Sequence, residues 1–237
     1  MTATARLKAV ARQARSRFER LWYVGNRVTC NLCHHSSRSW LHGRVAGRCP
    51  GCRSATRTRV LWWYLSKNVQ VASRKLLHFA PEMLLERNIR GTRTLNYVTA
   101  DFRNPKVDVQ VDIQALPFGD GEFDLILCSH VLEHIRDDKL AMRELRRVCS
   151  PNGSVLIMVP LSDSKHTRED LSELPPQVRK DRFGETDHLR EYGRDLVDML
   201  QQSGFRVVSF EPATEIPASI RARHGLGDNQ TIFVCSP

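Results

Sequence analysis

The feature that most constrains the fold is the alternation of apolar runs and amphipathic segments from residue 76 onward. Two runs, FDLILCS at 123–129 and SVLIMVP at 154–160, are apolar almost throughout, as in parallel strands covered on both faces. Strands are expected at 76–80, 94–99, 107–112, 123–129, 154–160, 205–210 and 230–235, and helices at 82–88, 137–149 and 189–203. This order predicts a doubly wound, Rossmann-like α/β domain with a seven-stranded sheet, whose last two strands pair antiparallel across a long loop.

Four of the seven cysteines form two Cys-x2-Cys pairs, Cys30 with Cys33 and Cys49 with Cys52, separated by fifteen residues. Two such knuckles close a tetrahedral structural zinc site, and Gly51 allows the second knuckle to turn. A redox-active cysteine pair and a coincidental spacing are the alternatives. We expect a zinc ribbon at 27–56, because zinc would hold together a short segment that has no core of its own.

The N-terminal part of the chain is strongly basic. Residues 1–75 contain 16 lysines and arginines and one acid, Glu19, while the whole chain carries a net charge of +10. A basic head of this kind suits an anionic partner such as nucleic acid, and an arginine-rich solvated surface is the alternative. Apolar residues recur at helical spacing, which predicts an amphipathic helix over 3–24. We expect this helix to pack its apolar stripe on the rest of the protein, and an arginine-rich targeting presequence is the alternative.

These features divide the chain into a basic helical region at 1–26, the ribbon at 27–56 and an α/β domain at 57–237. The polar stretch 162–182 contains two consecutive prolines, and we expect 162–187 to form a lid over the edge of the sheet. No apolar run reaches the roughly 18 residues of a membrane span. The start of the chain lacks the apolar core of a signal peptide, so we expect a cytoplasmic protein.

Polar residues follow four predicted strands at their carboxyl ends, where doubly wound sheets bind ligands. They are His78 to Glu82, Asp101, Asp112 with Ile113, and Ser129 to His134. Asp101 lies 19 residues after Glu82, the distance at which an acid binds ribose hydroxyls. Asp112 and its apolar neighbour Ile113 are suited to bracket a purine ring. The strand ends therefore predict a site for a nucleotide-like ligand.

The segment VDIQALPFGDGEFDLILCSHVLEHIRDDKLAMRELRRVCSPNGSVLIMVP, residues 111–160, resembles the central half of a class I S-adenosylmethionine-dependent methyltransferase. The acid before LPF, the FD at 123–124, HVLEHI and a proline–glycine turn occur there in this order. LHFAPE at 77–82, FGETDHLREYG at 183–193 and the two cysteine knuckles extend the likeness to a bacterial subgroup with an N-terminal zinc module. The resemblance covers residues 30–235 and implies a methyltransferase sheet.

The resemblance implies that S-adenosylmethionine binds at the strand ends, through His78, Phe79, Ala80, Pro81, Glu82, Asp101, Asp112, Ile113, Ser129 and His130. In the family an acid ends the first strand and glycines follow it. Here His78 stands in the place of the acid and Ala80 in that of the first glycine. We interpret the loop as remodelled, with backbone N–H groups exposed by a short turn and Glu82 binding the ammonium group of the cofactor. A lost cofactor site is the alternative.

HVLEH at 130–134 also matches H-x-x-E-H, the signature of inverted zinc peptidases. That chemistry needs both histidines on one face of a helix, whereas this motif directly follows a buried strand, so we favour the methyltransferase interpretation. Methyl transfer requires positioning and removal of a proton from the acceptor. His134 is a candidate general base, and a packing or capping role is its alternative.

Asp187, His188, Arg190 and Tyr192 form a polar cluster at the start of the helix expected at 189–203. The resemblance implies that they line the acceptor side, with His188 as a base, Arg190 as an anion clamp and Tyr192 shaping the site. In the alternative interpretation, Asp187 caps the helix and the others lie on its exposed face.

We therefore expect an S-adenosylmethionine-dependent methyltransferase that modifies an oxygen or nitrogen of a small-molecule or carbohydrate-like acceptor, with a structural zinc. An RNA methyltransferase whose basic head tracks phosphates is one alternative. A non-catalytic binding module, which keeps the methyltransferase fold and uses the basic zinc ribbon, is the other.

Overall fold

The computed structural model describes residues 22–41, 47–92 and 96–237. The chain forms two compact units, one from Met1–Val69 with Pro212–Gln230 and the other from Gln70–Glu211 with Thr231–Pro237. A C-terminal stretch thus belongs to the same unit as the cysteine knuckles, a division that the predicted domain boundaries did not contain. Nearly all of the helix predicted over 3–24 lies outside the described residues. No described helix has the length and apolar character that crossing a bilayer requires.

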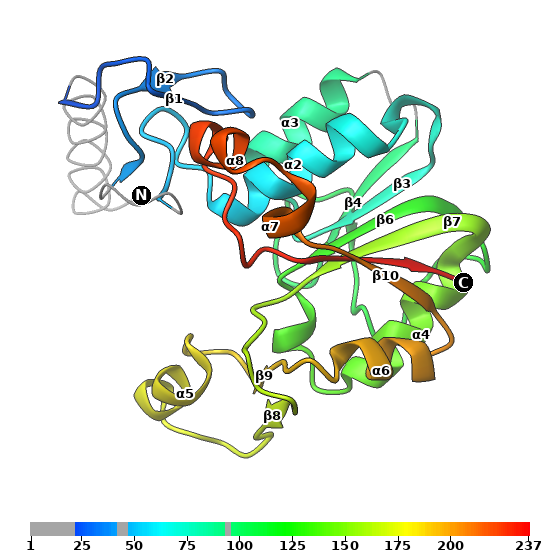
Figure 1. Cartoon of the computed structure of the whole chain (residues 1–237). Helices are drawn as coiled ribbons and strands as arrows, with labels where there is room; N and C mark the ends of the chain where they lie inside the picture. Colours follow the sequence, from blue (N-terminus) through cyan, green and yellow to red (C-terminus); the bar gives the residue numbers. More distant parts are fainter. Residues whose placement is uncertain (1–21, 42–46, 93–95) are drawn as a thin grey trace, which may run out of the picture. The chain divides into compact units, whose positions relative to one another are not determined.

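The larger unit is built on a seven-stranded sheet in the order β10-β11-β7-β6-β3-β4-β5, which confirms the predicted fold class (Figure 1). The strands are β3 (Leu76–Phe79), β4 (Tyr97–Asp101), β5 (Val109–Gln110), β6 (Phe123–Ser129), β7 (Cys149–Met158), β10 (Arg206–Phe210) and β11 (Ile232–Ser236). The pairs among β3 to β7 are parallel, and β11 runs antiparallel to both β7 and β10.

The strand order places a crevice at a defined point of this sheet. From β3 the chain moves outward to β4 and β5, and then crosses back to β6 and β7 on the other side of β3. Leu77 of β3 pairs with Val98 of β4 and Ile126 of β6, and both Leu77 and Ile126 are fully buried. In open α/β sheets, ligands bind beyond the carboxyl ends of the strands at such a reversal.

Helices cover both faces of the sheet. Figure 1 shows α3 (Met83–Gly91) on one face and α4 (Asp138–Val148) with α6 (Leu196–Gln202) on the other. The carboxylate of Asp137 accepts a hydrogen bond of 2.8 Å from the backbone N–H of Leu140 and so caps α4. Apolar side chains of α4 and α6 join the main core, including Met142, Leu145 and Leu200.

The helix expected at 189–203 was wrong in its first half. Residues 190–191 form β9 (Arg190–Glu191), which pairs antiparallel with β8 (Arg168–Glu169), and α6 begins only at Leu196. The cause is long-range pairing, because a partner strand about twenty residues away overrides a local helical pattern. Asp187 therefore caps no helix.

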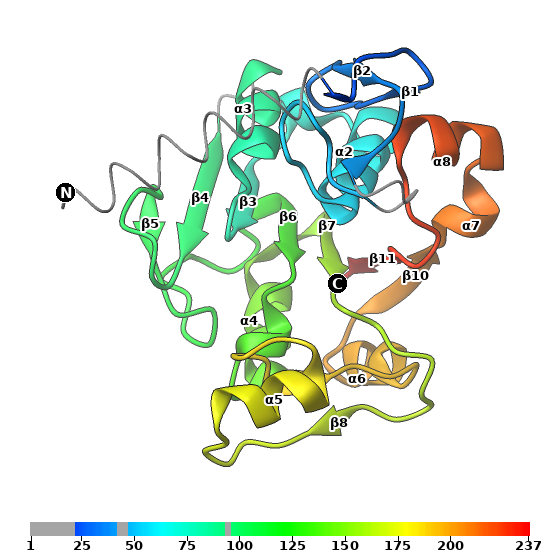
Figure 2. The ribbon, with the colours of Figure 1, turned by 90° about the vertical axis from the view of Figure 1, so that its left-hand side faces the viewer.

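The stretch 162–187 has secondary structure of its own. It contains β8 and α5 (Pro176–Phe183), and α5 ends at Gly184 in the left-handed conformation, with a φ of 89°. Buried Arg179 donates hydrogen bonds to the carbonyls of Asp170 and His188, at 3.0 and 3.1 Å. Figure 2 shows α5 and β8 beyond the carboxyl ends of β4 and β6.

The smaller unit combines the hairpin of β1 (Val28–Thr29) and β2 (Ser36–Ser37) with α2 (Thr56–Asn68), α7 (Pro212–Glu215) and α8 (Ala218–His224). The long loop expected between the last two strands thus contains two short helices. Hydrogen bonds join α8 to the knuckle region: Nδ1 of His224 lies 2.8 Å from the carbonyl of Thr29, and Nε1 of Trp40 donates to the carbonyl of Ala222 at 3.3 Å.

Arg59 of α2 lies at the centre of this unit and is completely buried. Its guanidinium donates to the carbonyls of Ser54, Gly47 and Gly225, at distances of 2.6, 2.7 and 2.9 Å. It also lies 4.3 Å from the ring centroid of Trp40. A buried charge is tolerated when every donor has a partner, and here these carbonyls meet that condition.

Candidate functional site

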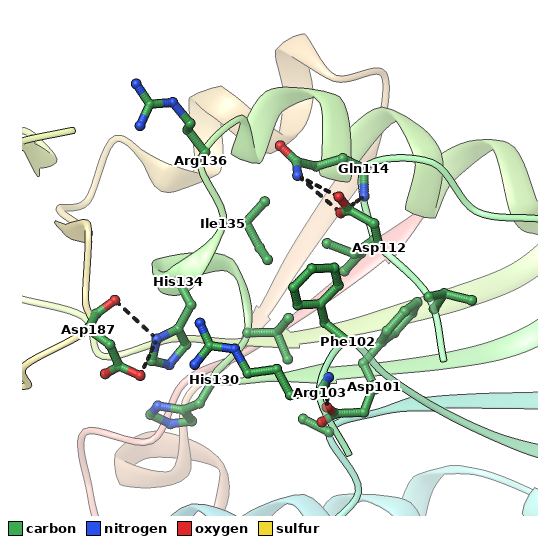
Figure 3. A pocket seen from close by; sticks show the side chains of 15 residues that line it. Asp101, Phe102, Arg103, Asp112, Gln114, His130, His134, Ile135, Arg136 and Asp187 are labelled. Atoms are coloured by element: carbon green, nitrogen blue, oxygen red, sulfur yellow. Dashed lines mark hydrogen bonds and ion pairs between the residues drawn. The ribbon is translucent and has the colours of Figure 1, made fainter. Parts of the chain in front are cut away.

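A pocket of about 460 Å³ opens at the carboxyl ends of β3, β4 and β6 (Figure 3). Its volume falls in the range of small-molecule and cofactor sites. Eight residues predicted from sequence line it: Phe79, Ala80, Asp101, Asp112, Ile113, His130, His134 and Asp187. The pocket thus lies where the strand order reverses, as expected of a doubly wound sheet.

The turn after β3 is made without glycine because Ala80 adopts a left-handed backbone conformation, with a φ of 46°. His130 at the end of β6 does the same, with a φ of 56°. A hydrogen bond of 2.8 Å holds each in place, from the N–H of Ala80 to the carbonyl of Ala100 and from the N–H of His130 to that of Met158. Such conformations cost roughly 1–3 kcal/mol and gather at functional sites.

Asp101 lines the pocket, and its carboxylate is held by the backbone through one of its two oxygens. Its Oδ1 accepts hydrogen bonds of 2.7 Å from the backbone N–H groups of Arg103 and Asn104. These bonds fix the carboxylate at the tip of β4 and leave Oδ2 for a ligand hydroxyl. The arrangement is chemically suited to a ribose.

Asp112 is held in a different way. Gln114 donates its backbone N–H to Oδ1 at 2.9 Å, and its side-chain amide lies 3.0 and 3.1 Å from the two carboxylate oxygens. The amide orients the carboxylate of Asp112 at the pocket wall (Figure 3). The next residue, Ile113, also lines the pocket. A polar edge next to an apolar side chain matches what a purine base requires.

Four residues predicted to bind a cofactor do not line the pocket, namely His78, Pro81, Glu82 and Ser129. His78 is completely buried, with its Nδ1 2.8 Å from the hydroxyl of Tyr97 and its Nε2 3.7 Å from Oε2 of Glu82. The hydroxyl of Ser129 points to the sulfur of Met158 at 3.9 Å. His78 and Ser129 are therefore buried within the sheet and do not face the pocket.

The pocket also contains residues that the sequence analysis missed, among them Phe102, Arg103, Gln114, Ile135 and Arg136. Each lies within two residues of a predicted site residue. Nearness in sequence to a predicted strand end was therefore the signal that could have identified these residues. Phe102 is 66% exposed, which is unusual for an aromatic side chain and leaves its ring available to a ligand.

The two candidate bases lie together at one end of the site. The rings of His134 and His188 meet edge to face, with 4.8 Å between centroids. Nδ1 of His134 lies 3.4 Å from both the carbonyl and the Oδ2 of Asp187 (Figure 3). His188 is buried behind His134, and its Nδ1 lies 2.9 Å from the carbonyl of Phe183.

Arg190 and Tyr192 do not reach the pocket. The guanidinium of Arg190 is buried, donates to the carbonyls of Leu132, Ile135 and Arg136, and pairs with Glu169. The hydroxyl of Tyr192 donates to Oδ2 of Asp138 at 2.7 Å, and burial, reinforced by the charge of Asp138, raises its pKa well above the usual value. In this structure both side chains support the loop that follows β6, in place of the acceptor contacts expected for them.

The motif HVLEH does not lie on one helix. His130 directly follows β6 and has a positive φ, and η3 (Leu132–His134) is a single turn of 3-10 helix. The two histidines therefore do not share the helix face that the peptidase interpretation requires.

The four cysteines of the smaller unit form a cluster whose ligand atoms lie within 4.8 Å of one another. The Sγ atoms of Cys30 and Cys52 are 3.8 Å apart, and those of Cys33 and Cys49 are 3.7 Å apart. A tetrahedron of 2.3 Å Zn–S bonds has edges of about 3.8 Å, so the cluster is compatible with a zinc ribbon. The backbone N–H groups of Gly51 and Cys52 point to the sulfur of Cys49, as in a knuckle.

Comparison with known proteins places these features in a family. Residues 25–210 match the model of the methyltransferase domain family. The chain is 34% identical over 122 residues to a malonyl-[acyl-carrier protein] O-methyltransferase of Erwinia billingiae, covering 49% of this chain and 45% of that protein. It is 32% identical over 133 residues to a ubiquinone/menaquinone biosynthesis C-methyltransferase of Klebsiella pneumoniae, covering 49% and 51%.

Among solved structures, an S-adenosylmethionine-dependent methyltransferase from Mesorhizobium loti superposes with a TM-score of 0.51. The sequence identity is 16%, and the match covers 74% of this chain and 96% of that one. This likeness concerns the fold. The chain spans about half the length of the curated relatives it matches, or less.

Proposed function

This chain belongs to the methyltransferase domain family of class I S-adenosylmethionine-dependent enzymes, and on that premise we propose that it transfers a methyl group to an oxygen or nitrogen of a small-molecule or carbohydrate-like acceptor. S-adenosylmethionine would supply the methyl group as a sulfonium. The observation that carries the proposal is the pocket at the ends of β3, β4 and β6, with Asp101 at its wall.

The cofactor half of the pocket is the part next to Ala80, Asp101 and Asp112. Oδ2 of Asp101 would accept hydrogen bonds from ribose hydroxyls, and the left-handed turn at Ala80 would bring backbone close to the methionine part. Phe102 and Ile113 offer apolar surface for the base. Binding through these residues uses groups that are already positioned by the fold, which lowers the entropic cost of association.

The acceptor half is the part next to His134 and Asp187. Arg103 and Arg136 also line the pocket and add positive charge, which favours an acceptor that carries an anionic group. We assign activation of the acceptor to the two imidazoles, His134 and His188, because they lie together at this end of the site. Positioning supplies much of the rate enhancement for an in-line displacement.

Transfer of a labelled methyl group tests the proposal. Purified protein is incubated with S-adenosylmethionine labelled in the methyl group and, separately, with a small-molecule fraction and an RNA fraction. Label should enter the small-molecule fraction, and the variant Asp101→Asn should incorporate less at limiting cofactor. Label in RNA alone would overturn the proposed acceptor class, and absence of cofactor binding would favour a non-catalytic module.

A further inference from the structure

Three side chains with metal-binding donors come together beside the pocket. Glu133, His134 and His188 each offer one ligand atom, and these atoms lie within 4.8 Å of one another. We propose that they form a site for a divalent transition-metal ion, separate from the cysteine cluster. The three residues come from η3 and from the segment before β9, more than fifty positions apart in the sequence.

Glu133 is the strongest sign of a missing ligand. Its side chain is only 1% exposed, and within the described part of the chain neither carboxylate oxygen accepts a hydrogen bond. Among the described residues its one close ionic neighbour is His130, whose Nδ1 lies 3.1 Å from Oε1. A buried carboxylate without hydrogen bonds is costly unless a cation compensates it, and a metal ion would do so.

The two histidines are oriented as metal ligands usually are. Nδ1 of His134 faces the carbonyl and carboxylate of Asp187, and Nδ1 of His188 faces the carbonyl of Phe183. An oxygen acceptor fixes the proton on Nδ1, so the lone pair of each ring is on Nε2. Outer contacts of this kind orient the ligating histidine in metal sites.

Hydrogen bonds from neighbouring residues hold the backbone around the three side chains. The N–H of Leu189 donates to the carbonyl of Glu133 at 2.8 Å, which joins the two ligand-bearing segments directly. Arg190 adds hydrogen bonds to the carbonyls of Leu132 and Arg136, at 2.9 and 3.0 Å. These hydrogen bonds fix the backbone that carries the three donor residues, as a metal site requires.

Two imidazole nitrogens and one carboxylate oxygen suit zinc, iron(II) or cobalt(II), and leave coordination positions open. Donors bound at about 2.1 Å around one ion lie about 3.4 Å apart, so metal binding would draw the three donor atoms, now within 4.8 Å of one another, closer together. Glu133 and His188 are buried, while His134 is 34% exposed and lines the pocket. The open positions therefore face the acceptor end of the pocket.

This inference rests on the proposed function for its chemical role, and it narrows the acceptor to a hydroxyl compound. On binding the metal, the hydroxyl loses its proton to water. The acceptor oxygen then forms a bond to the methyl carbon while the bond from that carbon to the sulfonium sulfur breaks, and its electron pair stays on sulfur. The histidines thus activate the acceptor through the ion rather than by taking the proton themselves.

Cobalt titration of the full chain tests the site. The protein is loaded with one equivalent of zinc, and Co²⁺ is then added while visible absorption is recorded. We expect one equivalent of Co²⁺ to bind in addition to the zinc. Its spectrum should show weak d–d bands and lack the intense charge-transfer bands of a thiolate ligand. Glu133→Gln and His134→Ala should each weaken this binding by about tenfold or more.

Two control variants and two checks of folding distinguish loss of a metal ligand from loss of structure. Glu185→Gln and His166→Ala change an exposed carboxylate and an exposed imidazole, and should leave cobalt binding unchanged. Retained ribbon zinc and an unchanged circular dichroism spectrum show that each variant is folded. Cobalt that binds only through thiolates, that fails to bind, or that binds equally to all variants would overturn the site.

Binding of S-adenosylhomocysteine separates the two claims. If the protein binds S-adenosylhomocysteine but no second metal ion, the metal site fails and the proposed function stands. If cobalt binds at the predicted residues but S-adenosylhomocysteine does not bind, the proposed function fails and the site stands.

Discussion

At the scale of single residues, the pocket depends on side chains that use some polar atoms for hydrogen bonds within the protein and keep others available for a ligand. Asp101 uses Oδ1 to cap the turn after β4, which leaves Oδ2 for the ligand. Ala80 and His130 accept backbone strain so that the chain turns sharply at the ends of β3 and β6. These positions are therefore shaped by the site more than by local stability.

The role of Asp101 leads to a prediction about affinity. Asp101→Asn keeps an oxygen acceptor for the turn but removes the charge that attracts ribose hydroxyls. We expect binding of S-adenosylhomocysteine to weaken by about 1–3 kcal/mol, measured by calorimetry. The control Asp163→Asn changes a fully exposed carboxylate and should have no effect. Equal affinity in both variants would remove Asp101 from the site.

Arg190 leads to a prediction about stability. Arg190→Met leaves Asp138, Glu169 and three carbonyls without their buried partner, and should lower the free energy of unfolding by about 3–5 kcal/mol. Urea denaturation measures the effect. Arg194→Met removes a guanidinium that is 71% exposed and should change stability by about 0.5 kcal/mol or less. Similar small effects in both variants would show that Arg190 does not support the loop.

Some of the site residues predicted from sequence line the pocket and others do not, and their positions in the fold explain the difference. Asp101, Asp112 and His130 lie at or just beyond the carboxyl ends of β4, β5 and β6, so the strand order brings them to one pocket. Arg190 and Tyr192 lie in a polar stretch whose burial depends on pairing between β8 and β9. A polar pattern does not distinguish a side chain that faces a ligand from one that holds a loop.

At the scale of elements, predictions succeeded where burial itself creates the pattern. The runs at 123–129 and 154–160 are apolar because neighbouring elements cover both faces, and they form β6 and the second half of β7. Short elements such as β9, α7 and α8 carry no comparable signal. They form because of contacts with distant segments, which local periodicity does not report.

The end of α8 leads to a prediction about the smaller unit. Gly225 has a φ of 60°, and a Cβ there would lie 2.5 Å from Cε2 of Trp40. Gly225→Ala should therefore lower the free energy of unfolding of this unit by about 2–4 kcal/mol, from backbone strain and overpacking together. Thermal unfolding, followed with zinc release, measures the loss.

Gly184→Ala is the matched control. Gly184 also has a positive φ, of 89°, but no atom of residues 22–41, 47–92 and 96–237 lies within 4 Å of an added Cβ. Gly184→Ala should therefore lower the free energy of unfolding by about 1–2 kcal/mol, from backbone strain alone. If both alanine variants lose the same stability, close packing against Trp40 contributes nothing at Gly225.

At the scale of the whole molecule, the chain combines two units with different sources of stability. The larger unit has a continuous apolar core around its sheet. The smaller unit depends on α2, α8, the buried Arg59 and the four cysteines. The smaller unit buries apolar side chains such as Trp40, Leu61 and Leu65, and a zinc ion at the four cysteines would couple metal binding to the folding of the knuckles.

Zinc removal should therefore affect one unit selectively. Cys49→Ser, or a strong chelator, should unfold the smaller unit, while the larger unit keeps its sheet. Hydrogen exchange resolved along the chain measures the two effects separately. Metal analysis that finds no zinc in folded protein would contradict the zinc ribbon.

The central claim is that a turn without glycine still forms a working cofactor site. The most direct measurement is a calorimetric titration of the purified, zinc-loaded chain with S-adenosylhomocysteine. Our account predicts micromolar binding with one site per chain, weakened in Asp101→Asn and unchanged in Asp163→Asn. Absence of binding by folded, zinc-loaded protein would contradict the account and would favour a methyltransferase fold that serves as a binding module.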